Sequence, residues 1–240
     1  MIPKVIHYCW FGKKEKSSEI LKCIESWKKY CPDYDIVEWN EDNFDVECIP
    51  FVKKAYSERK WAFVSDYARL KIVYENGGIY LDTDVELIKP LDDLLSLDCY
   101  MGIQKDGCVA TGLGFGALKG HEVLRALMYD YHNREFLQGK ACKTIACPIV
   151  NTEVLKKYGY IQEDKIQSFA GVTVFSSEYF DPKDCETYVL NTTENTYSIH
   201  HYDATWKTKN SKRRQVMIKT VVKLLGENNY LRLKNFIKNR

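Results

Sequence analysis

The stretch NGGIYLDTDVEL, residues 76–87, decides how the rest of this sequence is interpreted. Residues 76–78, Asn-Gly-Gly, predict the end of a helix, because glycine adopts the left-handed conformation without steric cost. The apolar run at residues 79–81 then predicts a short buried strand. Two carboxylates separated by one threonine, Asp82 and Asp84, follow that strand directly. A buried strand that ends in paired acids indicates a binding site at the edge of a sheet.

The sequence before this stretch predicts alternating strands and helices. The elements expected are a strand at 5–10, a helix at 18–30, a strand at 34–40 and a helix from Trp61 to the glycine pair. This alternation is typical of the α/β class, with a sheet of mostly parallel strands. The second half is less regular, with a glycine-rich stretch at 111–118, a helix at 121–132, a strand within 172–180 and a late strand within 197–206.

Composition places the chain among soluble globular proteins rather than membrane-spanning or disulfide-rich ones. Of its 240 residues, 45% are hydrophobic and 28% are charged, which is ordinary for a folded domain. No uncharged apolar run approaches the ~20 residues that a membrane span needs, and the N-terminus lacks a signal-peptide pattern. Nine cysteines without a C-x-x-C pair favour reduced thiols in a cytosolic protein over zinc or disulfides.

Charge is unevenly distributed along the chain, although the net charge is only +2. Residues 207–240 contain eleven Lys and Arg and one acid, whereas the preceding part contains 24 basic and 32 acidic side chains. We therefore expect one domain at 1–206 and a basic amphipathic helical tail at 207–240. The tail either packs its apolar stripe on the domain or attaches to an anionic membrane surface. No nucleic-acid-binding module accompanies the charge.

The paired carboxylates suggest a divalent cation. Alternation along a strand makes Asp82 and Asp84 project to the same side, where two negative charges repel and raise one pKa. A hard divalent ion with oxygen ligands resolves that repulsion. In parallel α/β sheets, ligands bind beyond the carboxyl ends of the strands, which is where this pair is expected. The alternative is a solvated turn with two aspartates.

The longer block SDYARLKIVYENGGIYLDTDVEL, residues 65–87, resembles the D-x-D region of glycosyltransferase family 32, which is also similar to the clostridial glucosylating toxins. Four further stretches within residues 1–206 are similar to family blocks: IPKVIHYCWFG, TGLGFGALKGH, CPIVNTEVLKKYG and ENTYSIHHYDATW. The resemblance implies a GT-A type, Rossmann-like domain that binds a nucleotide sugar. It also implies retaining, metal-dependent transfer of a hexose from a UDP- or GDP-sugar to a glycan or lipid-linked glycan.

The resemblance further implies a biological setting and a metal site. The setting is bacterial surface-polysaccharide synthesis, in the cytoplasm and on the inner face of the plasma membrane. In the metal site, Asp84 would ligate Mn²⁺ or Mg²⁺ directly, and Asp82 would contact the ribose or the water shell of the ion. A histidine of the late block would complete the coordination. Adjacent strand residues face opposite ways, and alignment with the family favours His200 over His201.

The resemblance also assigns donor-binding roles, each with a structural alternative. Asp66 and Arg69 lie on one helical face and would contact sugar hydroxyls and phosphate oxygens, or else form a surface ion pair. Trp10 would stack near the nucleobase or pack in the core. Tyr80 would line the donor pocket or be a buried strand tyrosine. Trp206 would donate its indole N–H to the departing phosphate, or simply pack.

Two other functions compete with this interpretation. A haloacid-dehalogenase-like phosphatase also places D-x-D after a strand, but it usually has Thr or Val where Glu86 stands and carries the motif near the start of its domain. A non-catalytic carbohydrate-binding module would bind glycan without a nucleotide or metal. The two are distinguished by phosphatase activity on an aryl phosphate and by calorimetry with nucleotide and Mn²⁺.

Overall fold

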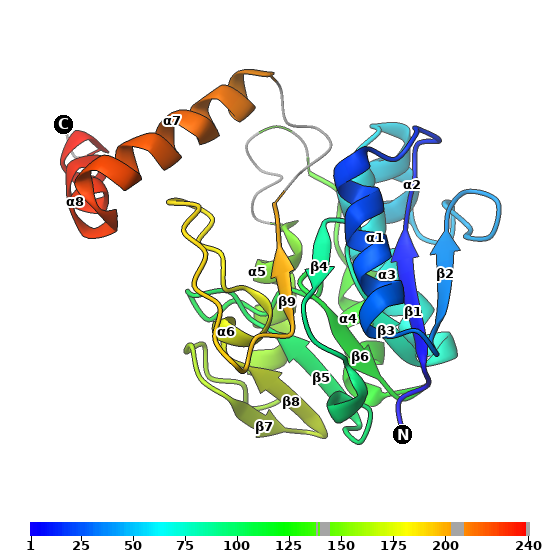
Figure 1. Ribbon diagram of the computed structural model, residues 1–240. Coiled ribbons are helices and arrows are strands. Elements are labelled where there is room, and N and C mark those ends of the chain that lie inside the picture. The colour runs from blue at the N-terminus through cyan, green and yellow to red at the C-terminus, as the bar shows by residue number, and fades with distance from the viewer. Residues whose placement is uncertain (138, 140–144, 203–208, 239–240) are drawn as a thin grey trace.

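The computed structural model describes residues 1–137, 139, 145–202 and 209–238 (Figure 1). A central mixed sheet is covered by helices on both faces, and a helical pair lies at one end of the molecule. The helices are α1 (Ser18–Tyr30), α2 (Pro50–Ser57), α3 (Trp61–Asn76), the 3₁₀ turn η1 (Asp92–Leu94), α4 (Glu122–His132), α5 (Cys147–Lys156), α6 (Ser177–Phe180), α7 (Lys209–Leu225) and α8 (Glu227–Lys238).

The large sheet has seven strands in the order β2 (Asp35–Trp39), β1 (Val5–Cys9), β3 (Gly78–Tyr80), β6 (Phe115–Ala117), β5 (Cys99–Gly102), β8 (Val172–Phe175) and β7 (Gln167–Phe169). Strand β1 pairs in parallel with β2 and β3, and β5 pairs in parallel with β8. Strand β6 is antiparallel to both neighbours, and β7 is antiparallel to β8. The sheet is therefore rich in parallel pairs, as the alternation of elements predicted.

Alternating residues of the strands divide the core into two halves. Ile79 of β3 and Tyr100 of β5 pack with α1 on one face of the sheet. Their neighbours Tyr80 and Met101 pack with α2, α3, α4 and α5 on the other face. Successive strand side chains point to opposite faces, so a strand covered on both sides is apolar throughout. This explains why Ile79, Tyr80 and Leu81 are all apolar and buried.

The glycine pair ends α3 and starts β3, as predicted. Gly77 and Gly78 have φ angles of 72° and 98°, which favour glycine. The N–H of Gly77 donates to the carbonyl of Val73 at 2.8 Å. A Cβ atom on Gly78 would lie 2.8 Å from the carbonyl oxygen of Val5. The pair therefore lets the chain reverse and pass close to β1, which delivers the following acids to the sheet edge.

A separate two-stranded ribbon of β4 (Val85–Leu87) and β9 (Ser198–His200) lies beyond β3. The strands are antiparallel, with Val85 opposite His200. Helix α1 contacts β4 through two side chains: Trp27 donates its indole N–H to the carbonyl of Val85 at 2.7 Å, and Ser26 accepts from the N–H of Leu87 at 2.9 Å. The ribbon is therefore fixed to the domain through α1.

The C-terminal part of the chain is helical, as expected from its apolar spacing. Helices α7 and α8 pack against each other, and Figure 1 shows them beyond the end of β9. Two polar contacts connect α8 to the domain, from Glu227 to Thr187 at 2.9 Å and from Lys234 to Glu186 at 2.8 Å. Among the described helices, none combines the length and the hydropathy of a membrane-spanning segment. The division into a domain and a tail at residue 206 stays a prediction.

We predict that Trp27→Phe loosens the β4–β9 ribbon, because it removes the indole N–H that donates to the carbonyl of the buried Val85 from a side chain that is itself fully buried. An unsatisfied buried carbonyl costs about 1–3 kcal/mol. Urea unfolding should therefore show a loss of that size. Trp61→Phe, at a half-buried tryptophan of α3, is the matched control and should lose less. Equal losses in the two variants would contradict the role given to the indole N–H.

Candidate metal and donor site

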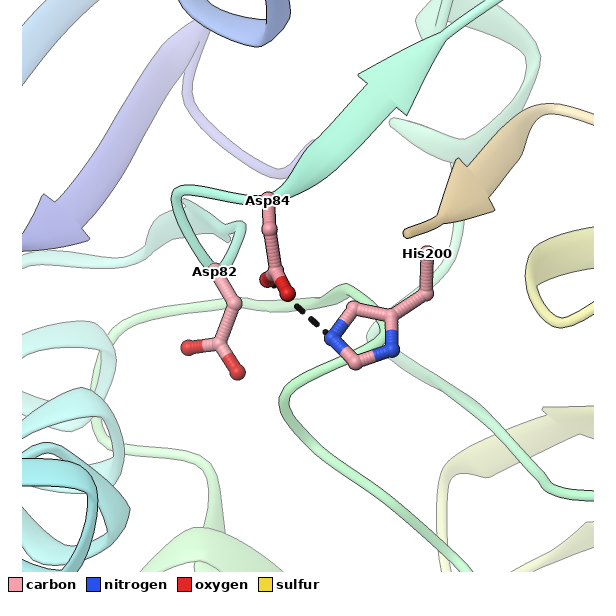
Figure 2. Close-up of side chains that lie close together, drawn as sticks. All are labelled: Asp82, Asp84 and His200. Carbon is pink, nitrogen blue, oxygen red and sulfur yellow. Dashed lines mark ion pairs between the residues drawn. The ribbon is translucent and has the colours of Figure 1, made fainter. Parts of the chain in front are cut away.

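The two aspartates lie in a turn between β3 and β4, not along one strand. Strand β3 ends at Tyr80, and the N–H of Val85 donates to the carbonyl of Asp82 at 3.0 Å, which closes the turn. The prediction that strand alternation sets the direction of Asp82 and Asp84 is therefore wrong. They still approach each other, because the turn folds both carboxylates toward the same space (Figure 2).

Arg69 of α3 fixes the position of Asp82. Its guanidinium Nη2 lies 3.0 Å from Asp66 Oδ1 and 3.2 Å from Asp82 Oδ1. Its Nε donates to the carbonyl of Ser65 at 3.0 Å, and the guanidinium lies 5.0 Å from the ring centre of Tyr80. Arg69 is only 3% exposed, so it is a buried bridge between two carboxylates rather than half of a surface ion pair.

Asp66 is the second carboxylate on this bridge, and it comes from the first half of α3. It is 8% exposed, and burial raises its pKa to about 6, although Arg69 and the backbone N–H of Cys147 favour its charged form. Cys147 is the first residue of α5. Asp66 therefore lies between the start of α5 and Arg69, where a ligand hydroxyl would meet an acceptor already held in place.

Tyr80 is a buried strand tyrosine, the alternative that the sequence left open. It is 1% exposed, and its hydroxyl donates to Asp82 Oδ1 at 2.9 Å. The same oxygen contacts Arg69, so Asp82 is held from two sides. Burial raises the pKa of Asp82, although Arg69 opposes that effect. Tyr80 therefore positions a site carboxylate, and its contact with a donor stays a prediction.

His200, at the end of β9, faces the two aspartates. Its Nε2 lies 3.1 Å from Asp84 Oδ1, as Figure 2 shows. One ligand atom from each of Asp82, Asp84 and His200 lies within 4.8 Å of the others. Burial lowers the pKa of His200, but Asp84 and the other nearby carboxylates outweigh burial and raise it overall. The cluster concentrates negative charge around one imidazole.

The neighbouring histidine points elsewhere. His201 Nε2 lies 2.7 Å from Glu86 Oε2, and its backbone N–H donates to the carbonyl of Asp84 at 3.0 Å. Lys183 contacts the carbonyl of His201 at 2.9 Å. The structure therefore groups His200, rather than His201, with Asp82 and Asp84.

The residues present fit a divalent ion. Two carboxylates and one imidazole form a donor set of oxygen and nitrogen atoms that suits Mn²⁺ or Mg²⁺. The other ring nitrogen of His200, Nδ1, is buried and has no hydrogen-bond partner in the described structure. That leaves Nε2 as the ring nitrogen that faces the carboxylates. The ion would be held by Asp84 and His200, with Asp82 beside it.

Comparison with known proteins gives one family match. Residues 17–101 match the family described as "Glycosyltransferase sugar-binding region containing DXD motif". This part of the chain is therefore similar to the sugar-binding region of DXD-type glycosyltransferases. The matched region contains Asp66, Arg69 and both aspartates of the turn, and it ends before His200.

Two curated relatives are also glycosyltransferases. The chain is 30% identical over 146 residues to inositol phosphoceramide mannosyltransferase 3 of Schizosaccharomyces pombe, which covers 55% of this chain but only 39% of that protein. It is 24% identical over 222 residues to the uncharacterized glycosyltransferase L373 of Acanthamoeba polyphaga mimivirus, covering 83% of this chain and 85% of that one. The chain thus spans well under half the length of the mannosyltransferase.

A solved structure shows the fold. The PaToxG glycosyltransferase superposes with a TM-score of 0.50 at 20% identity, covering 65% of this chain and 69% of that chain. The chain therefore has the GT-A type α/β fold that the sequence resemblance implied.

The glycine-rich stretch contributes a residue that the sequence did not assign. The carbonyl of Gly112 accepts from the N–H of Asp82 at 3.4 Å. A Cβ atom at Gly112 would lie 2.3 Å from Asp82 Oδ2 and 2.9 Å from Arg69 Nη1. The absence of a side chain at Gly112 thus lets the backbone lie close to the Asp82 carboxylate.

Two further sets of polar side chains lie beside the site. Beside Arg69, the buried Thr111, Cys147 and Asn151 form a cluster in which Asn151 Nδ2 lies 3.2 Å from Thr111 Oγ1 and 3.1 Å from Cys147 Sγ. Beside His200, burial raises the pKa of Asp181 to about 6, and Tyr202 donates to Asp181 at 2.6 Å. Thr111, Cys147, Asn151 and Tyr202 lie in stretches that resemble family blocks, but the sequence assigned them no role, because each reaches the site only through the fold.

The two tryptophans assigned to donor binding have different outcomes. Trp10 follows β1, is half-buried and donates its indole N–H to the carbonyl of Lys14 at 2.6 Å. Lys16 lies 5.5 Å from the centre of the Trp10 ring, so a nucleobase contact there stays a prediction. Trp206 lies outside the described residues.

A cleft of about 200 Å³ borders Asp84, between α1 and His201.

We predict that the two adjacent histidines respond differently to mutation. His200→Ala should abolish the rise in melting temperature that Mn²⁺ causes, because it removes a ligand of the cluster. His201→Ala should retain that rise, since His201 contacts Glu86 instead. An ion at about 100 times its dissociation constant stabilises by about 2.7 kcal/mol. Differential scanning fluorimetry with and without Mn²⁺ measures the shift, and equal behaviour of the two variants would contradict the assignment.

Proposed function

We propose that this chain is a metal-dependent, retaining glycosyltransferase that moves a hexose from a UDP- or GDP-sugar to a glycan or lipid-linked glycan. The observation that supports this function best is the convergence of Asp82, Asp84 and His200 beside the Asp66–Arg69 pair. The cluster suits an ion and diphosphate, and the pair offers a positioned acceptor for hydroxyl groups. The match to the DXD sugar-binding region supports the same conclusion.

The chemistry of this site is mainly charge stabilisation. A divalent ion, Mn²⁺ or Mg²⁺, supplies positive charge to the oxygens of the departing nucleoside diphosphate. The chain's own part is to hold the ligands still: Asp84 and His200 lie 3.1 Å apart, and Asp82 is fixed by Arg69 and Tyr80. Preorganised groups need no rearrangement as charge develops.

Asp66 and Arg69 would orient the donor sugar. Asp66 is the acceptor for sugar hydroxyls, because Arg69 and the Cys147 N–H hold it from behind. Arg69 is mostly occupied by its two carboxylates, so it acts chiefly by fixing them. Its direct contact with phosphate or sugar oxygens would use the remaining Nη1 side, where Cys147 Sγ lies 3.9 Å away.

The relatives suggest the class of substrate. One is named an inositol phosphoceramide mannosyltransferase. That name describes the transfer of a hexose to a lipid-borne acceptor. We extend both features to this chain as a hexosyl donor and a lipid-linked glycan. Retention of the anomeric configuration is proposed from the resemblance to family 32.

The two competing functions are less favoured. A phosphatase of the haloacid-dehalogenase type requires a free aspartate nucleophile, whereas Asp82 Oδ1 is bound by both Arg69 and Tyr80. A carbohydrate-binding module needs no metal cluster, yet Asp82, Asp84 and His200 form one. The glycosyltransferase match of residues 17–101 opposes both.

The basic tail supports attachment to an anionic membrane surface. Six large apolar side chains of its described part remain exposed: Val216, Met217, Leu224, Leu225, Leu233 and Phe236. Residues 207–240 also carry eleven basic side chains and one acid. Basic residues near an anionic surface contribute about 1 kcal/mol each. We propose that the enzyme works from the cytoplasm on the inner face of a bacterial plasma membrane, in surface-polysaccharide synthesis.

We predict that Asp84→Asn abolishes metal-dependent release of nucleotide from the donor, because it removes a charged ligand from the cluster without changing side-chain size. A screen of UDP- and GDP-hexoses with Mn²⁺ or Mg²⁺, read by released nucleotide, identifies the donor. The rate of nucleotide release should fall by at least roughly a hundredfold, as is usual when a group that stabilises charge in the transition state is removed.

Asp33→Asn is the matched control, since Asp33 is exposed before β2 at the opposite edge of the sheet. Circular dichroism should show both variants folded. Full nucleotide release by Asp84→Asn, in every donor that the unmutated protein uses, would refute the proposed role of the cluster.

We predict that the full chain co-sediments with vesicles containing phosphatidylserine and that deletion of residues 208–240 removes this binding. Met217→Asp with Leu224→Asp should weaken it in the same direction, because both side chains are exposed and apolar burial adds to the electrostatic attraction. Vesicles of phosphatidylcholine alone are the control. Sedimentation that is unchanged by the deletion would remove the membrane proposal and leave the catalytic one intact.

A further inference from the structure

Two exposed tyrosines on the domain share one cleft. Within the described part of residues 1–202, Tyr129 and Tyr158 are the only aromatic side chains classed as exposed, at 69% and 36%. Both line a single cleft of about 480 Å³ between α4 and the end of α5. Small-molecule sites have volumes of roughly 300–1,000 Å³. The other described aromatic rings of the domain are buried or half-buried, so the position of these two in one cleft requires an explanation.

One stripe of α4 forms the long wall of this cleft. Arg125, Tyr129 and Asn133 recur every four residues and line it together, with Asp130 beside them. Residues at this spacing share one face of a helix. Lys157 and Tyr158 form the opposite wall, just beyond α5. The cleft is therefore built by two packed helices and presents two aromatic rings among hydrogen-bonding side chains.

The charges of the cleft balance, which disfavours an ionic ligand. Its two acids are Glu122 and Asp130, and its two bases are Arg125 and Lys157. Glu122 lies 3.1 Å from Arg125, and Asp130 pairs with Arg134. A nucleotide or an anionic lipid headgroup would find no surplus of positive charge here. The basic tail, by contrast, has that surplus.

We propose that this α4–α5 cleft is a saccharide-binding site for a neutral glycan. Exposed tyrosine faces contact the C–H faces of pyranose rings, and tyrosine offers a large apolar surface with a polar end. The amide of Asn133 and the neighbouring carboxylate and guanidinium groups supply both donors and acceptors for sugar hydroxyls. A short uncharged oligosaccharide satisfies both kinds of group, and it matches the neutral charge balance.

The position of the cleft relates it to the donor site. Helix α4 has eleven residues, so the cleft follows it for about 16 Å at 1.5 Å per residue. Asn133 lies at the C-terminal end of α4. Next to it, His132 Nε2 lies 3.2 Å from the hydroxyl of Tyr67, and Tyr67 directly follows Asp66 in the chain. A glycan along α4 would thus lead toward the donor site. Its assignment as the distal part of the acceptor rests on the proposed function, whereas the saccharide binding itself does not.

The test is binding of neutral oligosaccharides to the full chain, without nucleotide or metal. An array of neutral glycans identifies a binder, and saturation-transfer NMR measures its affinity. Tyr129→Ala with Tyr158→Ala should weaken that affinity by roughly tenfold or more, as truncation of aromatic anchors does at other binding sites. Tyr30→Ala, at a half-buried tyrosine of α1, is the matched control and should bind normally.

Two results would overturn the saccharide site: no neutral glycan retained by the unmutated chain, or equal affinity in the double tyrosine variant. Equal melting temperatures show that the variants fold, which is expected because both rings are exposed. Asp84→Asn should keep glycan binding while it loses nucleotide release. The failure of the cleft proposal and the failure of the proposed activity are therefore seen in separate measurements.

Discussion

The site depends on one buried cation. Arg69 lies between Asp66 and Asp82, and neither carboxylate would be stable so close to the other without it. A buried charge is tolerated only when it is paired and hydrogen-bonded. Because Arg69 belongs to α3 and Asp82 to the turn after β3, this bridge fixes a helix and a turn to each other. Removal of the guanidinium would leave the buried Asp66 and the partly exposed Asp82 without the cation that they share.

Glycines in the surrounding backbone allow Asp82 to lie beside Arg69. The glycine pair at 77–78 lets β3 start directly behind α3, so Asp82 emerges beside the helix that carries Arg69. Gly112 leaves room for the carboxylate, where any side chain would collide with it. Buried polar groups also surround the bridge, including Thr111 and Asn151. Such groups are costly unless they are satisfied, and here Asn151 donates to both Thr111 and Cys147.

Local patterns in the sequence predicted the parts of the site that lie close together in the chain. The helix of Asp66 and Arg69, the glycine stop and the buried strand all have short-range signals, and they carry Asp82 and Asp84 to the sheet edge. Hydrophobic alternation did not predict the turn that carries Asp82 and Asp84, because alternation cannot distinguish a three-residue strand from a longer one. It also failed for β4, Cys147 and Asp181, whose places depend on contacts between distant segments. His200 was selected through the family resemblance, not through periodicity.

The short β4–β9 ribbon has a consequence for the whole molecule. An ion shared by Asp84 and His200 would tie together two segments that are far apart in the chain, much as a disulfide does, but reversibly. Cross-links that close long loops remove the most freedom from the unfolded chain. The resistance of this protein to heat would then vary with the divalent-metal content of its surroundings.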